Sequence, residues 1–141
     1  MIRVALAESD VDIDRCYPVM RELRPHLDSA TFAAQVRRQM GDGYRLAFVE
    51  DDGEAKAVAG FRFLEFLAWG RILYVDDLVT LAGERSKGFG EQLFDWLVAR
   101  AVENGCDQLH LDSGVQRFGA HRFYLRKRMD ITAHHFALRL R

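Results

Sequence analysis

The chain is poor in several residue types that would otherwise direct its interpretation. Its 141 residues include only two cysteines, two prolines and three lysines, and its formal net charge is −1. Cys16 and Cys106 lie far apart without metal-type spacing, so they predict neither a disulfide framework nor a zinc site. A net charge this close to zero gives no reason to expect nucleic acid as a partner.

Long apolar runs are also missing. No run approaches the ~20 residues that a membrane span needs, and the N-terminus lacks the basic and apolar segments of a secretory signal. We therefore expect a cytoplasmic protein with reduced thiols and no membrane partner. Apolar residues still make up 49% of the sequence. That is enough for one buried core, so we expect a single domain over residues 1–141.

The hydrophobic pattern predicts a mixed α/β sheet, in the order strand, two helices, three strands, helix, strand, helix, strand. The expected strands span residues 2–7, 44–50, 55–67, 71–81, 108–112 and 131–140. Ser9 or Asp10 is the expected cap of the first helix, and Asp28 or Ser29 that of the second. The later helices are expected over residues 89–103 and 117–127. The three central strands should form an antiparallel meander, and the next strand should run parallel to the third of them.

A glycine-containing stretch, Arg85-Ser86-Lys87-Gly88-Phe89-Gly90, connects a predicted strand to a predicted helix. Such a turn leaves backbone N–H groups pointing outward. Together with the positive end of the helix and the side chains of Arg85 and Lys87, they form a site for a phosphate or pyrophosphate. A Cβ at Gly88 or Gly90 would block the ligand or strain the turn. Gly-x-Gly by itself is also typical of a turn in which the glycines only reverse the chain.

The spacing of Arg85, Gly88 and Gly90, after a strand with the doubled acid Asp76-Asp77, resembles the acyl-CoA-binding motif of the GNAT N-acetyltransferase superfamily. The order of predicted elements is also that of the GNAT fold. Ala120-His121-Arg122-Phe123-Tyr124 is similar to the family's Ala-x-x-Phe-Tyr segment, whose tyrosine lies near the CoA sulfur. The chain departs from the family pattern at three places: Ala82 for proline, Arg117 for asparagine and Arg128-Met129 for Gly-Phe.

The resemblance implies an N-acetyltransferase that moves an acetyl group from acetyl-CoA to a primary amine. The acceptor would be a small molecule or a protein N-terminus or lysine. The backbone of Leu78, Val79 and Thr80 would pair with the pantetheine arm and supply the oxyanion donor. The pyrophosphate would be held by Arg85, Ser86, Lys87, Gly88, Phe89 and Gly90. Tyr124 would be the acid for the departing thiolate. The acceptor would bind near the first two helices, in segments that hold Arg24, His26, Asp28 and Tyr44.

Asp76 and Asp77 stand in the middle of a predicted strand, where aspartate is uncommon. Because an alternating strand turns neighbouring side chains to opposite faces, we do not expect a paired-carboxylate site. Each acid is open to two interpretations, a carboxylate satisfied by backbone N–H groups or a contact to the amine substrate. The general base stays unassigned, and two alternatives are open. A water could relay the proton to Asp76 or Asp77, or the amine could arrive already neutral and need no base.

Two further expectations concern the C-terminal region. His134 and His135 should face opposite sides of a strand, so we expect no metal site. The apolar edge of that last strand would need a cover, and a second copy of the chain in a two-fold dimer is the simplest one. The alternative function is a non-catalytic acyl-CoA-binding sensor. Tyr124 favours the enzyme, whereas Arg117 in place of the asparagine removes one expected polar contact to the cofactor.

Overall fold

The computed structural model describes residues 1–141, which fold as two compact units, Met1–His110 and Leu111–Arg141. The strands are β1 (Ile2–Leu6), β2 (Arg45–Asp51), β3 (Glu54–Phe66), β4 (Gly70–Thr80) and β5 (Gln108–Leu111). The helices are α1 (Asp10–Leu23), α2 (Phe32–Met40), the 3₁₀ helix η1 (Ala82–Lys87), α3 (Phe89–Glu103) and α4 (Phe118–Arg126). None of the helices is long and apolar enough to cross a membrane.

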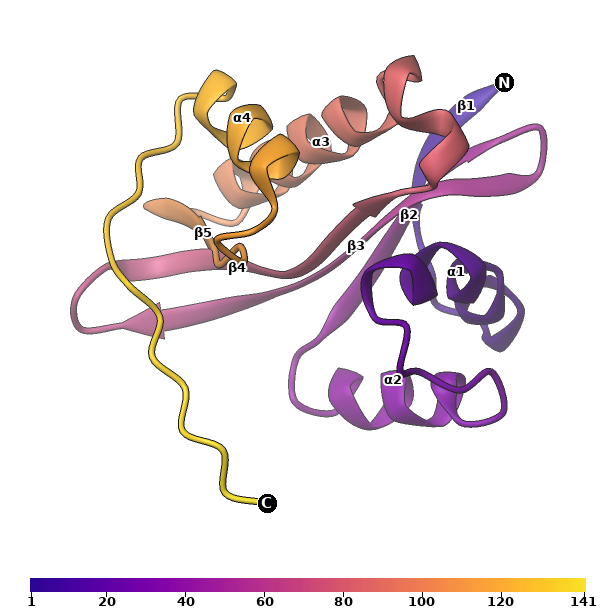
Figure 1. The fold of residues 1–141 in the computed structure, drawn as a ribbon, viewed down its shortest axis with the longest axis horizontal. Helices are drawn as coiled ribbons and strands as arrows, with labels where there is room; N and C mark the ends of the chain where they lie inside the picture. Colours follow the sequence, from indigo (N-terminus) through magenta and orange to yellow (C-terminus); the bar gives the residue numbers. More distant parts are fainter. The chain divides into compact units, whose positions relative to one another are not determined.

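The five strands form one sheet in the order β1-β2-β3-β4-β5 (Figure 1). Each of the strands β1, β2 and β3 pairs antiparallel with the next one along the chain. The prediction of an antiparallel meander inside a mixed α/β fold is therefore confirmed. The long β3–β4 pair forms the centre of this arrangement and carries the residues of the candidate site.

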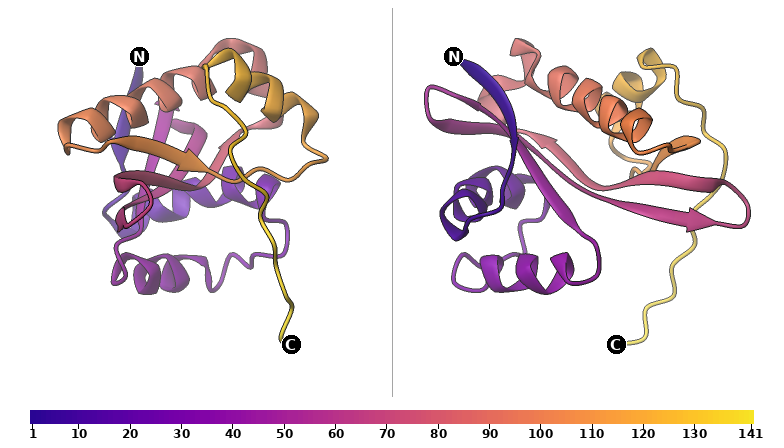
Figure 2. Two further views of the ribbon diagram at one scale, coloured as in Figure 1. Left: turned by 90° about the vertical axis from the view of Figure 1, so that its left-hand side faces the viewer. Right: turned by 180° about the vertical axis from the view of Figure 1, so that it is seen from behind.

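Helices cover both faces of the sheet. The first unit has α1 and α2 on one face and α3 on the other (Figure 2). On the first face, Ile13 of α1 and Val36 of α2 share one buried cluster with Phe48 of β2. On the second face, Phe61 of β3 meets Trp96 of α3 edge-on, with ring centroids 5.9 Å apart. Because both faces are covered, β2 and the first half of β3 are buried on both sides.

The two N-terminal helices begin differently. The Ser9 hydroxyl accepts a hydrogen bond from Asp12 N at 3.1 Å, which confirms Ser9 as the cap of α1. The predicted cap of α2 is wrong, since the cap position is Thr31 and no side chain bonds there. Asp28 Oδ1 instead accepts from Ala30 N at 2.9 Å. Aspartate often bonds the backbone two residues on, and here it builds a turn ahead of the helix.

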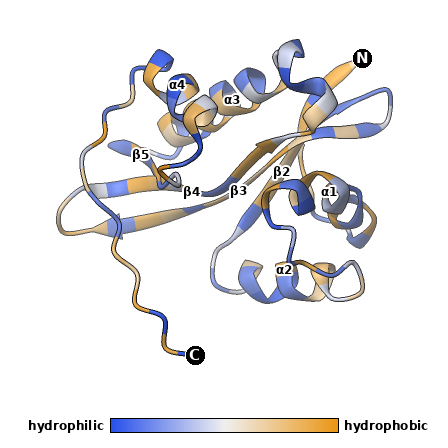
Figure 3. Ribbon diagram, viewed as in Figure 1, coloured by the Kyte–Doolittle hydropathy of each residue, from blue (hydrophilic) through white to orange (hydrophobic).

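The predicted last strand is wrong. Residues 131–141 form no regular secondary structure and are exposed throughout. This tail is largely hydrophobic (Figure 3), and Phe136, Leu138 and Leu140 are each at least 85% exposed. An alternating apolar pattern becomes a strand only when another strand supplies its hydrogen bonds, and none pairs with the tail. The argument for a dimer, which rested on the apolar edge of that strand, loses its basis.

Glu50 is the buried charged residue of the sheet. Arg3 of β1 and Arg15 of α1 both donate to its carboxylate, Arg15 Nη2 at 2.6 Å. Arg15 Nη2 also donates to Gly53 O at 2.7 Å, which ties α1 to the turn between β2 and β3. The hydrogen bond from Arg15 lowers the pKa of Glu50, with support from Arg3 and against the effect of burial.

This lowered pKa makes the stability of the fold depend on pH. A carboxyl that ionises more readily in the folded chain stabilises it fully above its ordinary pKa of 4.5, and loses that contribution as the pH falls through the lowered value. We expect Glu50→Gln to destabilise the protein at pH 7 and to match the wild type at strongly acidic pH. Urea unfolding of both proteins between pH 3 and pH 7 measures this difference.

The exposed Glu8 supplies a matched control for the same charge change. Glu8→Gln should unfold like the wild type across the whole series. A gap between Glu50→Gln and the wild type that stays constant with pH would contradict the role of the Glu50 charge.

Candidate active site

One extra residue interrupts the pairing of β4 with β3. Gly60 lies opposite Asp77 and Phe61 lies opposite Val75, so Asp76 has no partner in β3. Such a β-bulge breaks the alternation of side chains along its strand. The prediction that Asp76 and Asp77 face opposite sides is therefore wrong, since both line one cavity on the face covered by α1 and α2.

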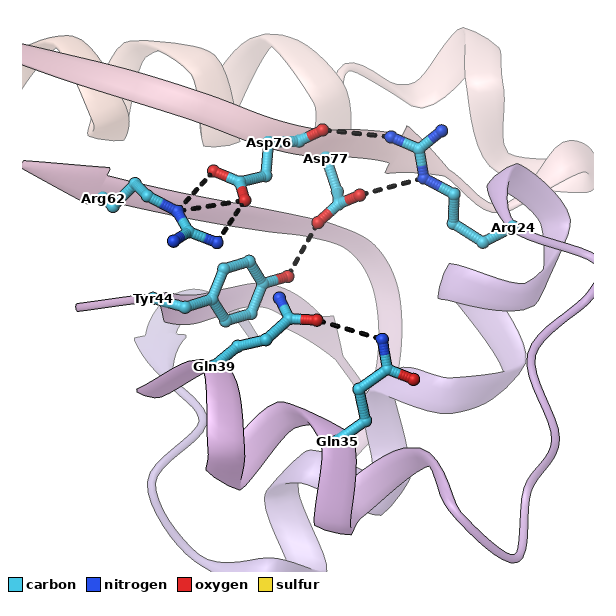
Figure 4. Close-up of polar contacts among 7 residues, drawn as sticks. All are labelled: Arg24, Gln35, Gln39, Tyr44, Arg62, Asp76 and Asp77. Atoms are coloured by element: carbon cyan, nitrogen blue, oxygen red, sulfur yellow. Dashed lines mark hydrogen bonds and ion pairs between the residues drawn. The ribbon is translucent and has the colours of Figure 1, made fainter. Parts of the chain in front are cut away.

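Each carboxylate of this acidic pair has its own basic partner (Figure 4). Arg62 of β3 donates to both oxygens of Asp76, with Nη2 2.7 Å from Oδ2. Arg24, at the end of α1, donates from Nε to Asp77 Oδ1 at 3.0 Å. Arg24 Nη2 also donates to the main-chain oxygen of Asp76 at 3.1 Å, so it bonds the backbone of the bulge itself. The two arginines fix both the charges and the shape of β4 here.

Tyr44 directly precedes β2 and lies against the bulge. Its hydroxyl donates to Asp77 Oδ2 at 2.8 Å, and its ring is buried. The ring fits because Gly60 has no side chain, since a Cβ there would lie 1.8 Å from the Tyr44 hydroxyl. Glycine is thus needed at position 60 because the Tyr44 ring approaches the backbone closely, and not because the chain turns there.

The acidic pair opens on a cavity of about 430 Å³, which is in the usual size range for a small-molecule site. Its lining comprises Met20, Arg24, His26, Leu27, Phe32, Gln35, Val36, Gln39, Tyr44, Tyr74, Asp76 and Asp77. Of the residues predicted to lie near the acceptor, Arg24, His26 and Tyr44 line the cavity, whereas Asp28 does not. Arg62, which pairs with Asp76 across two strands, could not be found from sequence, because the pairing depends on the register of β3 against β4.

Burial raises the pKa values of groups in and beside the cavity. It raises the pKa of the Asp76 carboxyl, and the Arg62 guanidinium opposes that shift. Burial also raises the pKa of Tyr44 well above its ordinary value, so its hydroxyl stays a hydrogen-bond donor to Asp77. In the adjacent core, burial raises the pKa of the Cys16 thiol to about 12, which makes Cys16 a packing residue and not a nucleophile.

The glycine-containing stretch forms the end of η1 and the start of α3. Gly88 has φ +82°, a left-handed conformation that favours glycine, and a Cβ there would meet nothing within 4 Å. The first N–H groups of a helix have no intrahelical partner, and no side chain caps α3. Gly90 lies close to β4, since a Cβ there would be 2.9 Å from Thr80 Oγ1. An open helix N-terminus of this kind suits an anion.

The side chains of this stretch divide by exposure. Arg85, Ser86 and Lys87 are exposed, whereas the Phe89 side chain is buried in the core and leaves only its backbone for a ligand. Lys87 Nζ lies 2.6 Å from a carboxylate oxygen of Glu84. The other Glu84 oxygen lies 3.1 Å from Lys56 Nζ on β3, which joins η1 to the sheet.

Leu78, Val79 and Thr80 form the last part of β4. They pair with Ala59, Val58 and Ala57 of β3. On the other side, Asp107 N donates to Arg71 O at 2.7 Å, so β5 begins beside the first part of β4. Residues 108–110 are too few to reach the end of an 11-residue strand from there. Within the first unit, the far edge of Leu78, Val79 and Thr80 therefore has no neighbouring strand.

Tyr124 belongs to the second unit, on α4. Its ring meets Phe123 edge-on at 5.7 Å. Burial raises the pKa of its hydroxyl, while the nearby Arg117 guanidinium opposes the shift. A phenol with a raised pKa stays protonated near neutral pH, which is the state that a proton donor needs. His121 bonds within the same unit, its Nε2 lying 2.8 Å from Gly114 O.

The bulged strand, the cavity beside it and the open helix N-terminus belong to consecutive elements of one α/β fold. The sequence profile of the Acetyltransferase (GNAT) family matches residues 11–129. The chain therefore belongs to the GNAT acetyltransferase family.

Relatives of known name agree with this assignment. The chain is 33% identical over 140 residues to the uncharacterized N-acetyltransferase YhdJ of Bacillus subtilis, covering 99% of this chain and 98% of that one. It is 30% identical over 121 residues to the aminoalkylphosphonate N-acetyltransferase of Salmonella typhimurium, covering 82% and 77%. The solved structure of aminoglycoside N-acetyltransferase AAC(6')-Iy with CoA has the same fold, with TM-score 0.86, 13% identity and coverage of 100% and 95%.

The contact between Gly60 and Tyr44 predicts a strong effect of one methyl group. Gly60→Ala would push the Tyr44 hydroxyl away from Asp77, because the new Cβ would lie 1.8 Å from it. We expect a loss of about 1–3 kcal/mol in the free energy of unfolding, typical of overpacking. Urea unfolding measures it. At Gly83 a Cβ would meet nothing within 4 Å, so Gly83→Ala is the matched control. Equal stability of the two variants would show that the Tyr44 ring yields without loss.

Proposed function

We propose that the protein transfers an acetyl group from acetyl-CoA to a primary amine. The observation that carries this proposal is the position of the acidic pair. Asp76 and Asp77 line a cavity of small-molecule size, and their strand continues directly into η1 and the open N-terminus of α3. The sites that we assign to the amine and to the anion thus lie on consecutive parts of the chain, and a two-substrate transfer needs its two substrates held next to each other.

The loop residues suit the pyrophosphate of CoA. The free N–H groups at the start of α3 and the open space at Gly88 admit an anion. We assign the pyrophosphate to Arg85, Ser86, Lys87, Gly88, Phe89 and Gly90, with Phe89 acting through its backbone alone. The unpaired edge of Leu78, Val79 and Thr80 is our assignment for the pantetheine arm and the oxyanion donor.

The reaction needs a neutral amine, a held thioester and a proton for the leaving group. Acetyl-CoA supplies the activated carbonyl carbon. The amine nitrogen bonds to that carbon, the C–S bond breaks, and the amine loses one proton. We assign this proton to Asp76 or Asp77, directly or through a water, because both carboxylates face the cavity. Tyr124 is our assignment for the proton that the CoA thiolate takes up.

We also propose which part of the chain carries out the reaction, in which compartment, and on which class of acceptor. The family match over residues 11–129 spans both units, so we propose that the whole chain works as one acyltransferase domain. Its two cysteines are free, which suits the reducing cytoplasm. The named relatives act on different amines, an aminoalkylphosphonate and an aminoglycoside. Their names therefore support an amine acceptor here without specifying which one.

The function is tested by incubating the purified protein with acetyl-CoA and a panel of amines. The panel spans small molecules and peptides with free N-termini or lysines, and thiol release is followed. Acetylation of at least one amine is expected. Tight binding of acetyl-CoA without turnover of any amine would instead favour a non-catalytic acyl-CoA sensor.

The loop assignment predicts a selective loss of cofactor binding in Gly88→Val. A branched side chain at φ +82° strains the turn and blocks the anion site, so we expect acetyl-CoA affinity to fall by about 10- to 100-fold or more. Calorimetric titration measures it. Gly53 has φ +80° and equally open surroundings on the β2–β3 turn. Gly53→Val should introduce a similar backbone strain yet bind acetyl-CoA with normal affinity. Unchanged affinity in a folded Gly88→Val protein would refute the assignment.

The role of Tyr124 predicts a change in kcat with little change in acetyl-CoA affinity. Tyr124→Phe removes the donor but keeps the ring, and the loss of one positioned acid lowers kcat by roughly 10²–10⁴-fold. Steady-state kinetics with the best amine of the panel, together with acetyl-CoA titration, separate the two effects. Normal turnover would leave Tyr124 as a packing residue.

A further inference from the structure

Resting on the proposed function, we infer that the acceptor is a small primary amine that also carries an anionic group, a carboxylate or a phosphonate. Arg24 is the residue assigned to that anion, and the acidic pair, Asp76 and Asp77, is the site of the amine. The inference depends on the unused donors of Arg24, on the distribution of charge around the cavity and on the cavity's size.

Arg24 has hydrogen-bonding capacity left over. A guanidinium presents five N–H donors in a planar fork. Arg24 uses Nε for Asp77 Oδ1 and one N–H of Nη2 for Asp76 O. The remaining three N–H groups, including both on Nη1, are free to bind a planar or tetrahedral anion, and the side chain is 43% exposed.

Arg62 is less accessible than Arg24. Its side chain is only 23% exposed, and its Nε and Nη2 are both engaged by Asp76. Arg62 does not line the cavity, whereas Arg24 does. The charge of Arg62 is thus committed to Asp76, and Arg24 is the arginine that a bound molecule meets.

The charges around the cavity are separated by element. Both acids come from β4, and the positive charge of Arg24 comes from the segment that joins α1 to α2. The α2 side contributes the neutral amides of Gln35 and Gln39, which bond to each other at 3.1 Å. A ligand with a cationic and an anionic end matches this separation, because each end meets groups of opposite charge.

The size of the cavity and the spacing of its charges limit the ligand further. A volume of about 430 Å³ suits a small molecule. Since Arg24 Nε lies 3.0 Å from Asp77 Oδ1, the amine and the anion of one molecule would bind to adjacent groups. The spacer between them is therefore short, as in a β-amino acid or a 2-aminoalkyl phosphonate.

Matched pairs of amines test this inference. The carboxylate arm compares β-alanine with β-alaninamide, and the phosphonate arm compares 2-aminoethylphosphonate with ethanolamine. Each is assayed with acetyl-CoA by thiol release. We expect the wild type to prefer the anionic member of at least one pair by about 10- to 100-fold in kcat/KM, as a charged hydrogen bond typically contributes. The arm with the larger preference identifies the anion.

Arg24→Gln should abolish that preference. The ratio between the two members of a pair is the decisive quantity, because a general loss of activity from disturbing Asp77 affects both members alike. Arg24→Lys keeps the charge without the fork and should retain part of the preference. Arg21, exposed on the same helix and outside the cavity lining, supplies the matched control, and Arg21→Gln should keep the wild-type ratio.

Three outcomes would overturn the inference. Equal kcat/KM for charged and neutral members in the wild type would exclude an anionic acceptor while leaving the proposed acetyltransferase intact. An undiminished preference in a folded Arg24→Gln protein would remove Arg24 from the anion site. Failure of the wild type to acetylate any amine, including the wider panel, would refute the proposed function and this inference with it.

Discussion

A residue without a partner in an antiparallel ladder turns side chains out of their normal alternation, and Asp76 does this in the middle of β4. The bulge brings two neighbouring carboxylates to one face, where each requires a cation or a donor because both are largely removed from water. Arg62, Arg24 and Tyr44 meet that requirement. The cavity therefore has its acidic pair where the strand is irregular, whereas the regular helices α1 and α2 contribute apolar side chains and two neutral amides.

The groups around the bulge depend on one another. Arg24 holds the backbone of Asp76 as well as the side chain of Asp77. Tyr44 reaches Asp77 only because Gly60 leaves room for its ring. Removing one member of such a network leaves another buried polar group unsatisfied, which costs more than the lost contact alone. The network thus links the end of α1, the start of β2 and the β3–β4 pair into one preorganised side of the cavity, which is the side that we propose for the acceptor.

The proposed cofactor side depends on local backbone geometry instead. Between η1 and α3 the groups that we propose for binding are backbone N–H groups at a helix start, and ion pairs and hydrogen bonds of nearby side chains hold the turn in place. Lys56 joins Glu84 of η1 to β3, and Glu22 of α1 accepts a hydrogen bond from Ala82 N at 2.9 Å. Such local geometry follows from glycines and helix ends close together in the chain. That explains why the motif Arg85–Gly90 could be found from sequence.

Local sequence thus determined the order of the helices and strands, the capping of α1 by Ser9 and the position of the glycine-containing loop, because each depends on residues within a few positions of one another. Tertiary structure alone decided that Asp76 and Asp77 share a face, since a bulge is a property of two paired strands and appears in neither one by itself. It also decided that Arg62 and Arg24 are their partners, across 14 and 53 residues of chain. The C-terminal tail also shows that pairing between strands is decided by tertiary structure. Residues 131–140 have the alternating pattern of a strand, yet no neighbouring strand supplies the hydrogen bonds that would make them one.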